Sequence, residues 1–306
     1  MTVRVGIINV TGFAGIEAAR LLWNHPEAEL VAATGRSLAG QRLGEAFPSL
    51  AVYRDLVIDD DINVEVDIVM SALPTAASAE ACAPYVRQGI PVIDIAADFR
   101  LRDEAAYREW YGADHPAPDI LQQAVYGLPE LNREALRSAK LVANPGCPAT
   151  SLLALAPAFA DGLIEDTIIV DAKSGISGAG RGGGGGFSYA DVNEDVSAYK
   201  VAAHNHQPEI AQELGCLREG PQPKVTFVPH LVPMTRGIAT CSRRWWRCRA
   251  RPGPGPLPRL LWRRAVHERR LGAAAAYQAH ARQQHGPCPS RRRPAKRHAR
   301  RHRRAR

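Results

Sequence analysis

Residues 3–15 read VRVGIINVTGFAG, and this stretch decides the fold of the N-terminal part of the chain. The β-branched run at 3–10 predicts a strand, and the apolar periodicity after residue 15 predicts a helix. Gly6, Gly12 and Gly15 fall at this turn, where glycines let the backbone approach a pyrophosphate and the helix N-terminus supplies N–H donors. We expect a dinucleotide-binding turn. An ordinary strand-to-helix turn is the alternative, since Asn9 stands where a further glycine is expected.

Further strands follow at 29–34, 66–70 and 91–95, with helical segments between them. Alternating strands and helices predict a parallel sheet, so the fold class is α/β with a doubly wound, Rossmann-type domain over residues 1–146. After residue 146 the pattern changes to a helix at about 149–160 and strands at 167–172, 224–229 and up to 240. This predicts a second, α+β catalytic and dimerisation domain at 147–240.

A C-terminal tail at 241–306 has a different composition from the rest of the chain. It holds 21 of the 39 Lys and Arg residues and one of the 31 acids, so residues 1–240 are acidic although the formal net charge is +8. Three interpretations compete: a nucleic-acid-binding arm, a disordered solubilising tail, or the product of a shifted reading frame. We favour the shifted frame, because the change is abrupt and interrupts a predicted sheet. Nucleic acid is then not an expected partner.

Composition excludes several classes of protein. No stretch approaches the ~18 to 20 apolar residues of a membrane helix, and the N-terminus starts directly with a strand pattern, so a cytoplasmic protein without a membrane partner is expected. The six cysteines show no disulfide-framework spacing and no C-x-x-C pair. Cys82 and Cys216 lie in helical apolar patterns and are predicted to be buried structural residues.

The end of the second predicted strand bears on the choice of cofactor. Residues 34–37 read TGRS, with no acid to accept a bond from the 2′-hydroxyl of NAD. Arg36 and the hydroxyl of Ser37 suit a 2′-phosphate, so the sequence favours NADP(H). A solvated surface arginine is the alternative.

Cys147 is the candidate nucleophile. It follows Asn144-Pro145-Gly146 directly and starts a predicted helix, where backbone N–H groups and the helix dipole stabilise a thiolate. Two histidines, His204 and His206, lie about 60 residues later, and a cysteine with a distant histidine is a candidate nucleophile–base pair. Zinc is the alternative for two such histidines, but no third ligand is evident nearby, so no metal is expected.

At this point the chain resembles the N-acetyl-gamma-glutamyl-phosphate reductase family, which is related to aspartate-semialdehyde dehydrogenase. The segments that carry the resemblance over residues 1–240 are Gly6–Gly15, Asp94–Arg100, Val125–Glu130, Asn144–Cys147, Asp171–Arg181, His204–Glu209 and Pro233–Gly237. The resemblance implies attack of the Cys147 thiolate on an acyl phosphate, loss of phosphate, and reduction of the Cys147 thioester by NADPH to a semialdehyde, in arginine biosynthesis. It also implies a homo-oligomer built through the second domain.

The family's functional residues are carried over onto matching positions. A histidine acts as general acid and base, for which we expect His204 before His206. The cofactor-binding positions implied are Gly6, Thr11, Gly12, Phe13, Ala14, Gly15, Arg36, Ser37, Pro74, Ser177 and Gly178. Those implied for the substrate and its phosphate are Arg100, Asn144, Ser174, Glu209 and Arg236; a guanidinium fork at Arg100 and a hydroxyl at Ser174 suit phosphate oxygens.

Two departures from the family leave alternatives open. Residues 148–150 read PAT where the family usually has Tyr-Pro-Thr, and an Ala-Thr ending is found in related reductases of carrier-protein-linked aminoadipyl or glutamyl phosphate. Nothing in 241–306 matches the segment that completes the second sheet and closes the cofactor site. Exposed sheet edges and weak activity are therefore expected, and a protein of the family fold inactivated by its altered C-terminus is a further alternative.

Overall fold

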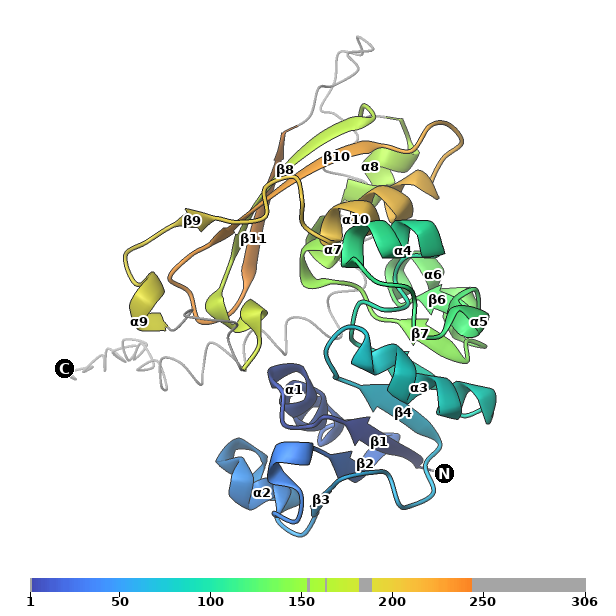
Figure 1. Ribbon diagram of the computed structural model, residues 1–306, viewed down its shortest axis with the longest axis vertical. Coiled ribbons are helices and arrows are strands. Elements are labelled where there is room, and N and C mark those ends of the chain that lie inside the picture. The colour runs from blue at the N-terminus through green and yellow to red at the C-terminus, as the bar shows by residue number, and fades with distance from the viewer. Residues whose placement is uncertain (1, 153–154, 163, 182–188, 244–306) are drawn as a thin grey trace, which may run out of the picture. The chain divides into compact units, whose positions relative to one another are not determined.

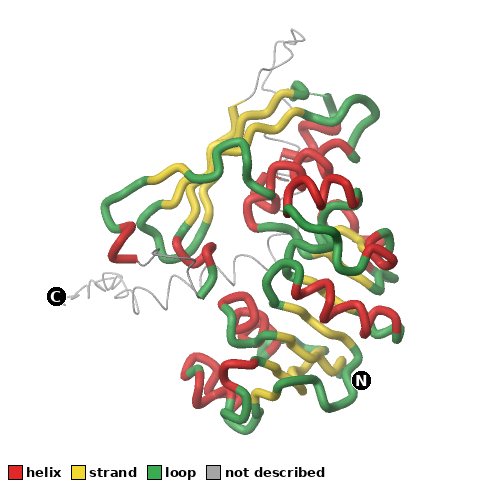
Figure 2. The backbone as a smooth tube through the Cα atoms, in the orientation of Figure 1, coloured by secondary structure: helices red, strands yellow, loops and turns green. Residues whose placement is uncertain are grey.

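A computed structural model describes residues 2–152, 155–162, 164–181 and 189–243. The described residues form two sheets, drawn with their helices in Figures 1 and 2. The hypotheses about the tail lie outside the described residues, apart from 241–243. These three residues continue the last strand beyond residue 240, where the sequence placed the end of the second domain.

The first sheet is parallel throughout, with strand order β3-β2-β1-β4-β5-β7-β6. Its strands are β1 Val3–Ile8, β2 Ala28–Thr34, β3 Ile58–Asp59, β4 Ile68–Ser71, β5 Val92–Asp94, β6 Ala124–Tyr126 and β7 Leu141–Ala143. The chain winds outward from β1 in one direction and then restarts from β4 in the other. The predicted doubly wound fold is confirmed, and its switch point lies between β1 and β4, where such sheets bind ligands at the carboxyl ends of their strands.

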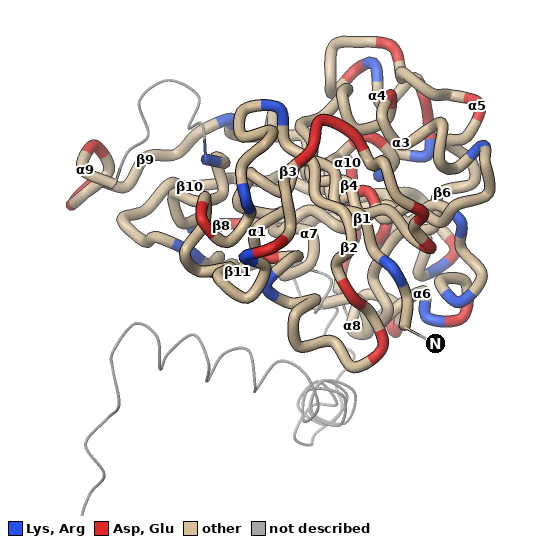
Figure 3. The backbone as a smooth tube through the Cα atoms, turned by 90° about the horizontal axis from the view of Figure 1, so that it is seen from below, with Lys and Arg blue, Asp and Glu red and all other residues tan. Residues whose placement is uncertain are grey.

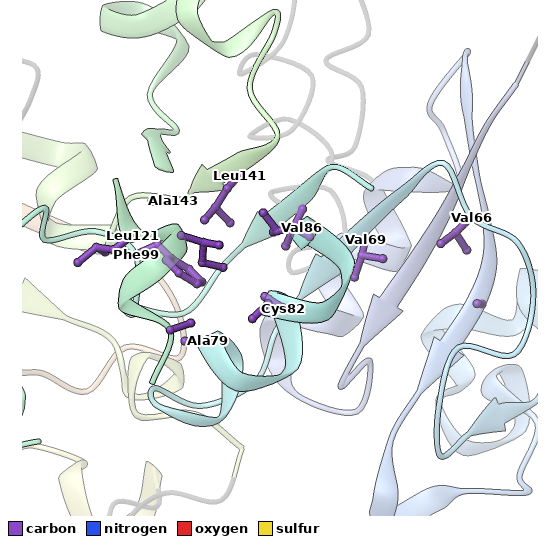
Figure 4. Close-up of a cluster of buried hydrophobic side chains, with 14 residues drawn as sticks. Val66, Val69, Ala79, Cys82, Val86, Phe99, Leu121, Leu141 and Ala143 are labelled. Carbon is purple, nitrogen blue, oxygen red and sulfur yellow. The ribbon is translucent and has the colours of Figure 1, made fainter. Parts of the chain in front are cut away.

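The helices of this part connect successive strands. They are α1 Phe13–Leu22, α2 Leu43–Ala46, α3 Ala77–Arg87, α4 Glu104–Tyr111, α5 Pro118–Leu121 and α6 Pro129–Leu136, with 3-10 helices at Arg36–Leu38 and Pro48–Tyr53. Helix α3 buries its apolar face, including Cys82 and Val86, against Val69 and Phe99 (Figure 4). This confirms the prediction that Cys82 is a buried structural cysteine.

The second sheet has the order β11-β8-β10-β9 and mixes parallel and antiparallel pairs. Its strands are β8 Thr167–Ser174, β9 Ser197–Ala198, β10 Lys224–Leu231 and β11 Ile238–Arg243; α7 Cys147–Leu152, α8 Ala156–Ala160, α9 Tyr189–Val192 and α10 His206–Gly215 accompany them, with a 3-10 helix at Ile176–Ala179. Strands β8, β10 and β11 run side by side (Figure 1). The predicted α+β class of this part is confirmed.

Two sequence predictions for this part are wrong in detail. The predicted helix at 149–160 is two helices, because Pro157 lies in the first turn of α8 and has no N–H with which to continue a preceding helix. Cys216 is exposed and not buried: it follows the last residue of α10, where Arg102 Nη1 donates to its sulfur at 3.5 Å.

Acidic and basic positions are interspersed along the described backbone (Figure 3). The described residues contain no helix that is long and apolar enough to cross a membrane.

Candidate active site

Cys147 is the first residue of α7, immediately after the turn that follows β7. The backbone fixes this turn at both ends, because the Asn144 N–H donates to the Asp94 carbonyl at 2.8 Å and the Thr150 N–H donates to the Gly146 carbonyl at 2.9 Å. Cys147 is exposed. The predicted nucleophile is thus held at the carboxyl end of the sheet, where a substrate can reach its thiol.

The position of Cys147 at a helix start predicts a lowered thiol pKa, but its surroundings raise the pKa instead. Desolvation by the surrounding protein raises the pKa of the thiol, and the nearby Glu209 carboxylate raises it further. The residue's own backbone N–H and the charge of Arg100 lower the pKa, but they do not outweigh desolvation. Formation of the thiolate therefore requires a base beside Cys147.

His206 contacts the turn that precedes Cys147. It is the first residue of α10, and its Nδ1 lies 2.8 Å from Glu209 Oε2, one turn along the same helix. A methyl group on Gly146 would lie 2.1 Å from His206 Cε1, so the imidazole packs directly against the residue before Cys147. Only a glycine at this position leaves room for the ring.

Glu209 is completely buried and holds the site together. Its Oε1 accepts from the Gly146 N–H and from the Tyr126 hydroxyl, both at 2.7 Å, and Arg100 Nη1 lies 3.6 Å from Oε2. Burial alone raises the pKa of Glu209, but the bond from His206, the Arg100 charge and the Gly146 N–H together hold it below its usual value. Glu209 is consequently an anion and can only accept, so His206 carries its proton on Nδ1 and leaves Nε2 as the free ring nitrogen.

His204 has a different environment. Its ring stacks on His206 with centroids 4.8 Å apart, and its Nδ1 accepts from the His206 backbone N–H at 3.2 Å. Burial, together with the charge of His206, lowers the pKa of His204 to about 4. The geometry favours His206 over His204 as the base, contrary to the order expected from the sequence.

Glu209 was predicted to contact the substrate, and in the structure both of its carboxylate oxygens already have protein partners, so a substrate contact stays a prediction. Through these bonds it orients His206 and Gly146. Arg236, also predicted to bind substrate, donates from Nη1 to Glu17 of α1. That ion pair occupies part of its guanidinium.

The other predicted phosphate contacts lie close to the cysteine turn or at the end of β8. Arg100 is buried; its Nε donates to the Asn144 carbonyl at 2.8 Å and its Nη2 to the Ile95 carbonyl at 2.9 Å. Asn144 Nδ2 donates to the Pro145 carbonyl at 3.2 Å, and the buried Ser174 hydroxyl donates to the Gly175 carbonyl at 3.2 Å. Arg100 already supports the cysteine turn, and its role toward phosphate stays a prediction.

The turn after β1 has the geometry that a dinucleotide requires. Asn9 adopts φ 62°, a left-handed conformation that asparagine tolerates, which explains why no glycine is needed there. Its Nδ2 donates to the Ala72 carbonyl at 2.8 Å, so the loops after β1 and β4 are tied together at the switch point, and the Thr11 hydroxyl donates to Asn9 Oδ1 at 3.2 Å. A methyl group on Gly15 would lie 2.5 Å from the Asn9 carbonyl oxygen.

Helix α1 presents an open N-terminus at this turn. Gly12 caps it without a side-chain bond, its first turn contains no acid, and Phe13 and Ala14 are its first residues. A methyl group on Gly12 would meet no atom closer than 3.5 Å, so there is space above the backbone. These features fit a pyrophosphate on the N–H groups of the helix.

Gly6 does not belong to this turn. It lies inside β1, and a methyl group there would be 2.7 Å from Ile62 Cδ1. The close approach of Ile62 therefore explains why residue 6 is a glycine. A cofactor contact at Gly6 stays a prediction. Arg36 and Ser37 are exposed at the start of the 3-10 helix after β2, where the cofactor's 2′-phosphate is expected.

The remaining predicted cofactor positions lie in two loops. Pro74 follows β4, and its carbonyl accepts from the Ser78 N–H at 3.1 Å. Ser177 and Gly178 lie in the 3-10 helix after β8, where the Ser177 N–H donates to the Thr235 carbonyl at 3.1 Å. Their contacts with a cofactor stay predictions. Within the described ranges, no three His, Cys, Asp or Glu side chains are placed to hold a metal ion.

Two tyrosines of this site were missed by sequence reasoning. Tyr126 ends β6 and donates to Glu209, while Tyr199 lies against His204 with ring centroids 5.7 Å apart and close enough to Cys147 for the thiolate charge to raise its pKa. Tyr126 lies in the segment 125–130 that carries the family resemblance, but nothing in its spacing connects it with a residue 83 positions away.

Comparison with known proteins places this geometry in a family. Residues 4–139 match the NAD binding domain of semialdehyde dehydrogenase, and residues 147–249 match the semialdehyde dehydrogenase dimerisation domain. The N-acetyl-gamma-glutamyl-phosphate reductase of Dehalococcoides mccartyi is 53% identical over 240 residues, which cover 78% of this chain and 70% of the relative. The reductase of the same name from Pelotomaculum thermopropionicum is 48% identical over 244 residues, with the same coverage.

Solved structures show the same fold at lower sequence identity. Aspartate semialdehyde dehydrogenase from Candida albicans, crystallised with NADP, has a TM-score of 0.57 and 17% identity, covering 86% of this chain and 76% of that one. Aspartate semialdehyde dehydrogenase II from Vibrio cholerae has a TM-score of 0.58 and 18% identity, covering 81% of this chain and 75% of that one.

Proposed function

Since the chain belongs to the semialdehyde dehydrogenase family, we propose that it reduces N-acetyl-gamma-glutamyl phosphate to N-acetyl-glutamate semialdehyde, with release of phosphate, in arginine biosynthesis. The two relatives of this name described above are 53% and 48% identical over more than two thirds of their length. The observation that carries the proposal is the exposed Cys147 at the start of α7, beside a His206 that Glu209 orients.

The first half of the reaction uses the free nitrogen of His206. This nitrogen takes the proton of Cys147, whose pKa is raised by desolvation, and so generates the thiolate. The sulfur attacks the acyl carbon, the bond from that carbon to the phosphate oxygen breaks, and phosphate leaves with the electron pair. The product is a thioester on Cys147. Arg100, whose charge acts on Cys147, supplies positive charge for the leaving phosphate.

The second half is a reduction. NADPH, when bound, supplies a hydride to the thioester carbon. His206, now protonated, gives its proton to the developing alkoxide and then takes it back as the carbon–sulfur bond breaks. The semialdehyde departs and the Cys147 thiolate is restored. The chain's own contribution is to hold one nucleophile and one proton carrier in fixed positions.

The residues at the switch point support NADP(H) as the cofactor. The open N-terminus of α1 and the space above Gly12 fit the pyrophosphate, and the exposed Arg36 and Ser37 fit a 2′-phosphate because no acid lies at the end of β2. We place the cofactor domain at 1–146 and the catalytic and dimerisation domain at 147–240. We also propose a homo-oligomer formed through the second domain, and a cytoplasmic location.

A second substrate has one observation in its favour. Pro148 and Ala149, the residues that replace the usual Tyr-Pro, are buried in the first turn of α7 next to the nucleophile. A reductase of carrier-protein-linked aminoadipyl or glutamyl phosphate is therefore the competing candidate. It would use the same chemistry on a larger substrate.

The experiment that tests the proposal measures the reaction in reverse. NADP+ reduction with N-acetylglutamate semialdehyde should require phosphate, and Cys147→Ser should abolish it because a serine hydroxyl is a far weaker nucleophile at neutral pH. Exposed Cys216, changed to Ser in the same way, is the matched control and should leave the rate unchanged. Phosphate-independent activity, or activity that survives in Cys147→Ser, would refute the proposed chemistry. Activity only with a carrier-linked semialdehyde would select the second substrate.

A further inference from the structure

The two oxygens of Glu209 have different partners. Oε1 accepts from the Tyr126 hydroxyl and from the Gly146 N–H, both at 2.7 Å. Oε2 lies 2.8 Å from His206 Nδ1. A carboxylate group can rotate about its last side-chain bond, so each oxygen keeps its own donors only if the group is fixed in one orientation. The two donors on Oε1 fix this orientation, and of these two only the Tyr126 hydroxyl belongs to a side chain.

Sheet register places Tyr126 beside the cysteine turn. Tyr126 pairs with Ala143 at the carboxyl ends of β6 and β7, and the Gly127 N–H donates to the Ala143 carbonyl at 2.8 Å. Asn132 Nδ2 donates to the Tyr126 carbonyl at 2.9 Å and fixes the backbone after the strand. Because β7 leads directly into the turn that carries Cys147, the phenol and the nucleophile are held by the same pair of strands.

The Tyr126 hydroxyl does more than fill space. Its ring is buried with 3% of its surface exposed, and a phenylalanine would occupy the same volume without the O–H. Burial and the Glu209 charge raise the pKa of the phenol above its usual value, so it stays protonated and donates throughout the working pH range. A buried hydroxyl without a partner would be strongly destabilising, so packing alone would favour phenylalanine at this position. The hydroxyl of Tyr126 is therefore explained by its bond to Glu209.

We infer that Tyr126 is a positioning residue of this active site: its hydroxyl fixes Oε1 of Glu209, so that Oε2 stays on His206 Nδ1 and the free His206 nitrogen is left for Cys147. The inference rests on the proposed function for the roles of Cys147 and His206. It adds a residue that touches neither substrate nor cofactor and acts through Glu209.

Loss of this hydroxyl has a predictable electrostatic effect. With one donor fewer, the Glu209 charge is less neutralised, so it disfavours the Cys147 thiolate more strongly. The other titratable groups that face Glu209 are Arg100 from the loop after β5, Tyr111 at the end of α4, Glu213 on α10 itself and His204 just before α10. Tyr126→Phe leaves all of these in place. The Cys147 titration therefore moves to higher pH.

The test measures the thiol without substrate or cofactor. The rate of Cys147 alkylation by iodoacetamide is followed against pH, with the modified peptide quantified by mass spectrometry so that Cys216 and Cys241 do not contribute. In Tyr126→Phe the midpoint should rise by about half a pH unit or more, and the acid limb of the reverse reaction should move with it. Tyr107→Phe is the matched control, because it removes a 3.0 Å bond from an equally buried tyrosine to the Asp98 carboxylate.

An unchanged alkylation midpoint in Tyr126→Phe, or an equal shift in Tyr107→Phe, would overturn the inference. The alkylation profile is independent of the acyl substrate, so it stands even if the assay with N-acetylglutamate semialdehyde fails. A second measurement uses the Glu209→Gln background, where the charge that Tyr126 acts through is gone. There Tyr126→Phe should cause no further shift, and an additive shift would show that the hydroxyl acts on the thiol by another route.

Discussion

Replacing Glu209 by glutamine removes the buried negative charge of the site while leaving the shape of the side chain nearly unchanged. The amide still offers one oxygen, and the Tyr126 hydroxyl and Gly146 N–H both require an acceptor at Oε1. The NH₂ group then faces His206 Nδ1 and can only donate to it. His206 is forced into the tautomer that carries its proton on Nε2, so it cannot accept the proton of Cys147.

The size of the effect follows from two contributions. Loss of a hydrogen bond between His206 and a charged acceptor costs about 1.5–3 kcal/mol, which corresponds to roughly 10- to 150-fold in rate if it falls on the transition state. The wrong tautomer adds to this, since the equivalent Asp→Asn change in a serine–histidine–aspartate triad lowers kcat by about 10⁴. We expect kcat/KM of Glu209→Gln to fall by at least about 10², without a comparable change in KM for NADP+. A loss below about threefold would refute the reasoning.

Stability gives an independent check on the same variant. Glu209→Gln leaves Arg100, 8% exposed, without the anion 3.6 Å from its Nη1, so we expect a loss of about 2–4 kcal/mol in the free energy of unfolding at pH 7. The folded-state pKa of Glu209 lies below its ordinary value of 4.5, so its stabilisation is complete above that pH and disappears as the pH falls further. Urea melts should show the deficit of the variant shrinking below about pH 4.5. A deficit independent of pH would contradict the assigned charge.

Two further predictions concern the cofactor turn and the second histidine. Gly15→Ala places a methyl group 2.5 Å from the Asn9 carbonyl oxygen, so thermal melts should show a loss of about 1–3 kcal/mol, whereas Gly12→Ala, with 3.5 Å to its nearest atom, should keep its stability and lose NADPH affinity in a fluorescence titration. Equal destabilisation of both would contradict this. Burial lowers the pKa of His204 from 6.5 to about 4, so folded-state stability falls as the pH drops through that range. His204→Gln should flatten this slope in urea melts and leave the acid limb of the rate profile unmoved; a retained slope would count against it.

The parts of the fold that follow local rules could be predicted from the sequence. The run at 3–10 and its turn determine a strand and a helix within a few residues, and the alternation after it determines a parallel sheet. Cys147 could be found for the same reason, because a cysteine that follows a turn and starts a helix is defined by its immediate neighbours. The sequence alone predicted a stabilised thiolate, whereas desolvation raises the pKa of Cys147. Desolvation depends on atoms from distant segments, so it could not be predicted from the neighbouring residues.

Residues whose roles depend on packing could not be assigned in this way. His204 and His206 are two positions apart in the same polar stretch, and only the direction of α10 decides which ring meets Gly146 and Glu209. Gly6 matches a cofactor pattern, but it is a glycine because Ile62, from a loop more than 50 residues away, fills the space above it. Cys216 fits an apolar helical pattern yet is exposed, because α10 ends at the residue before it.

The single carboxylate of Glu209 explains why these distant residues act together. Its donors come from the end of β6, the turn after β7 and the start of α10, and none of them alone offsets the cost of burying an anion. Ionised Glu209 is therefore favourable only when all three segments are in place, which is also the only arrangement in which His206 meets the cysteine turn. Assembly of the nucleophile–base pair is thereby coupled to packing of α10 on the strands that carry Tyr126 and Cys147, and a change at any one donor should lower both activity and stability.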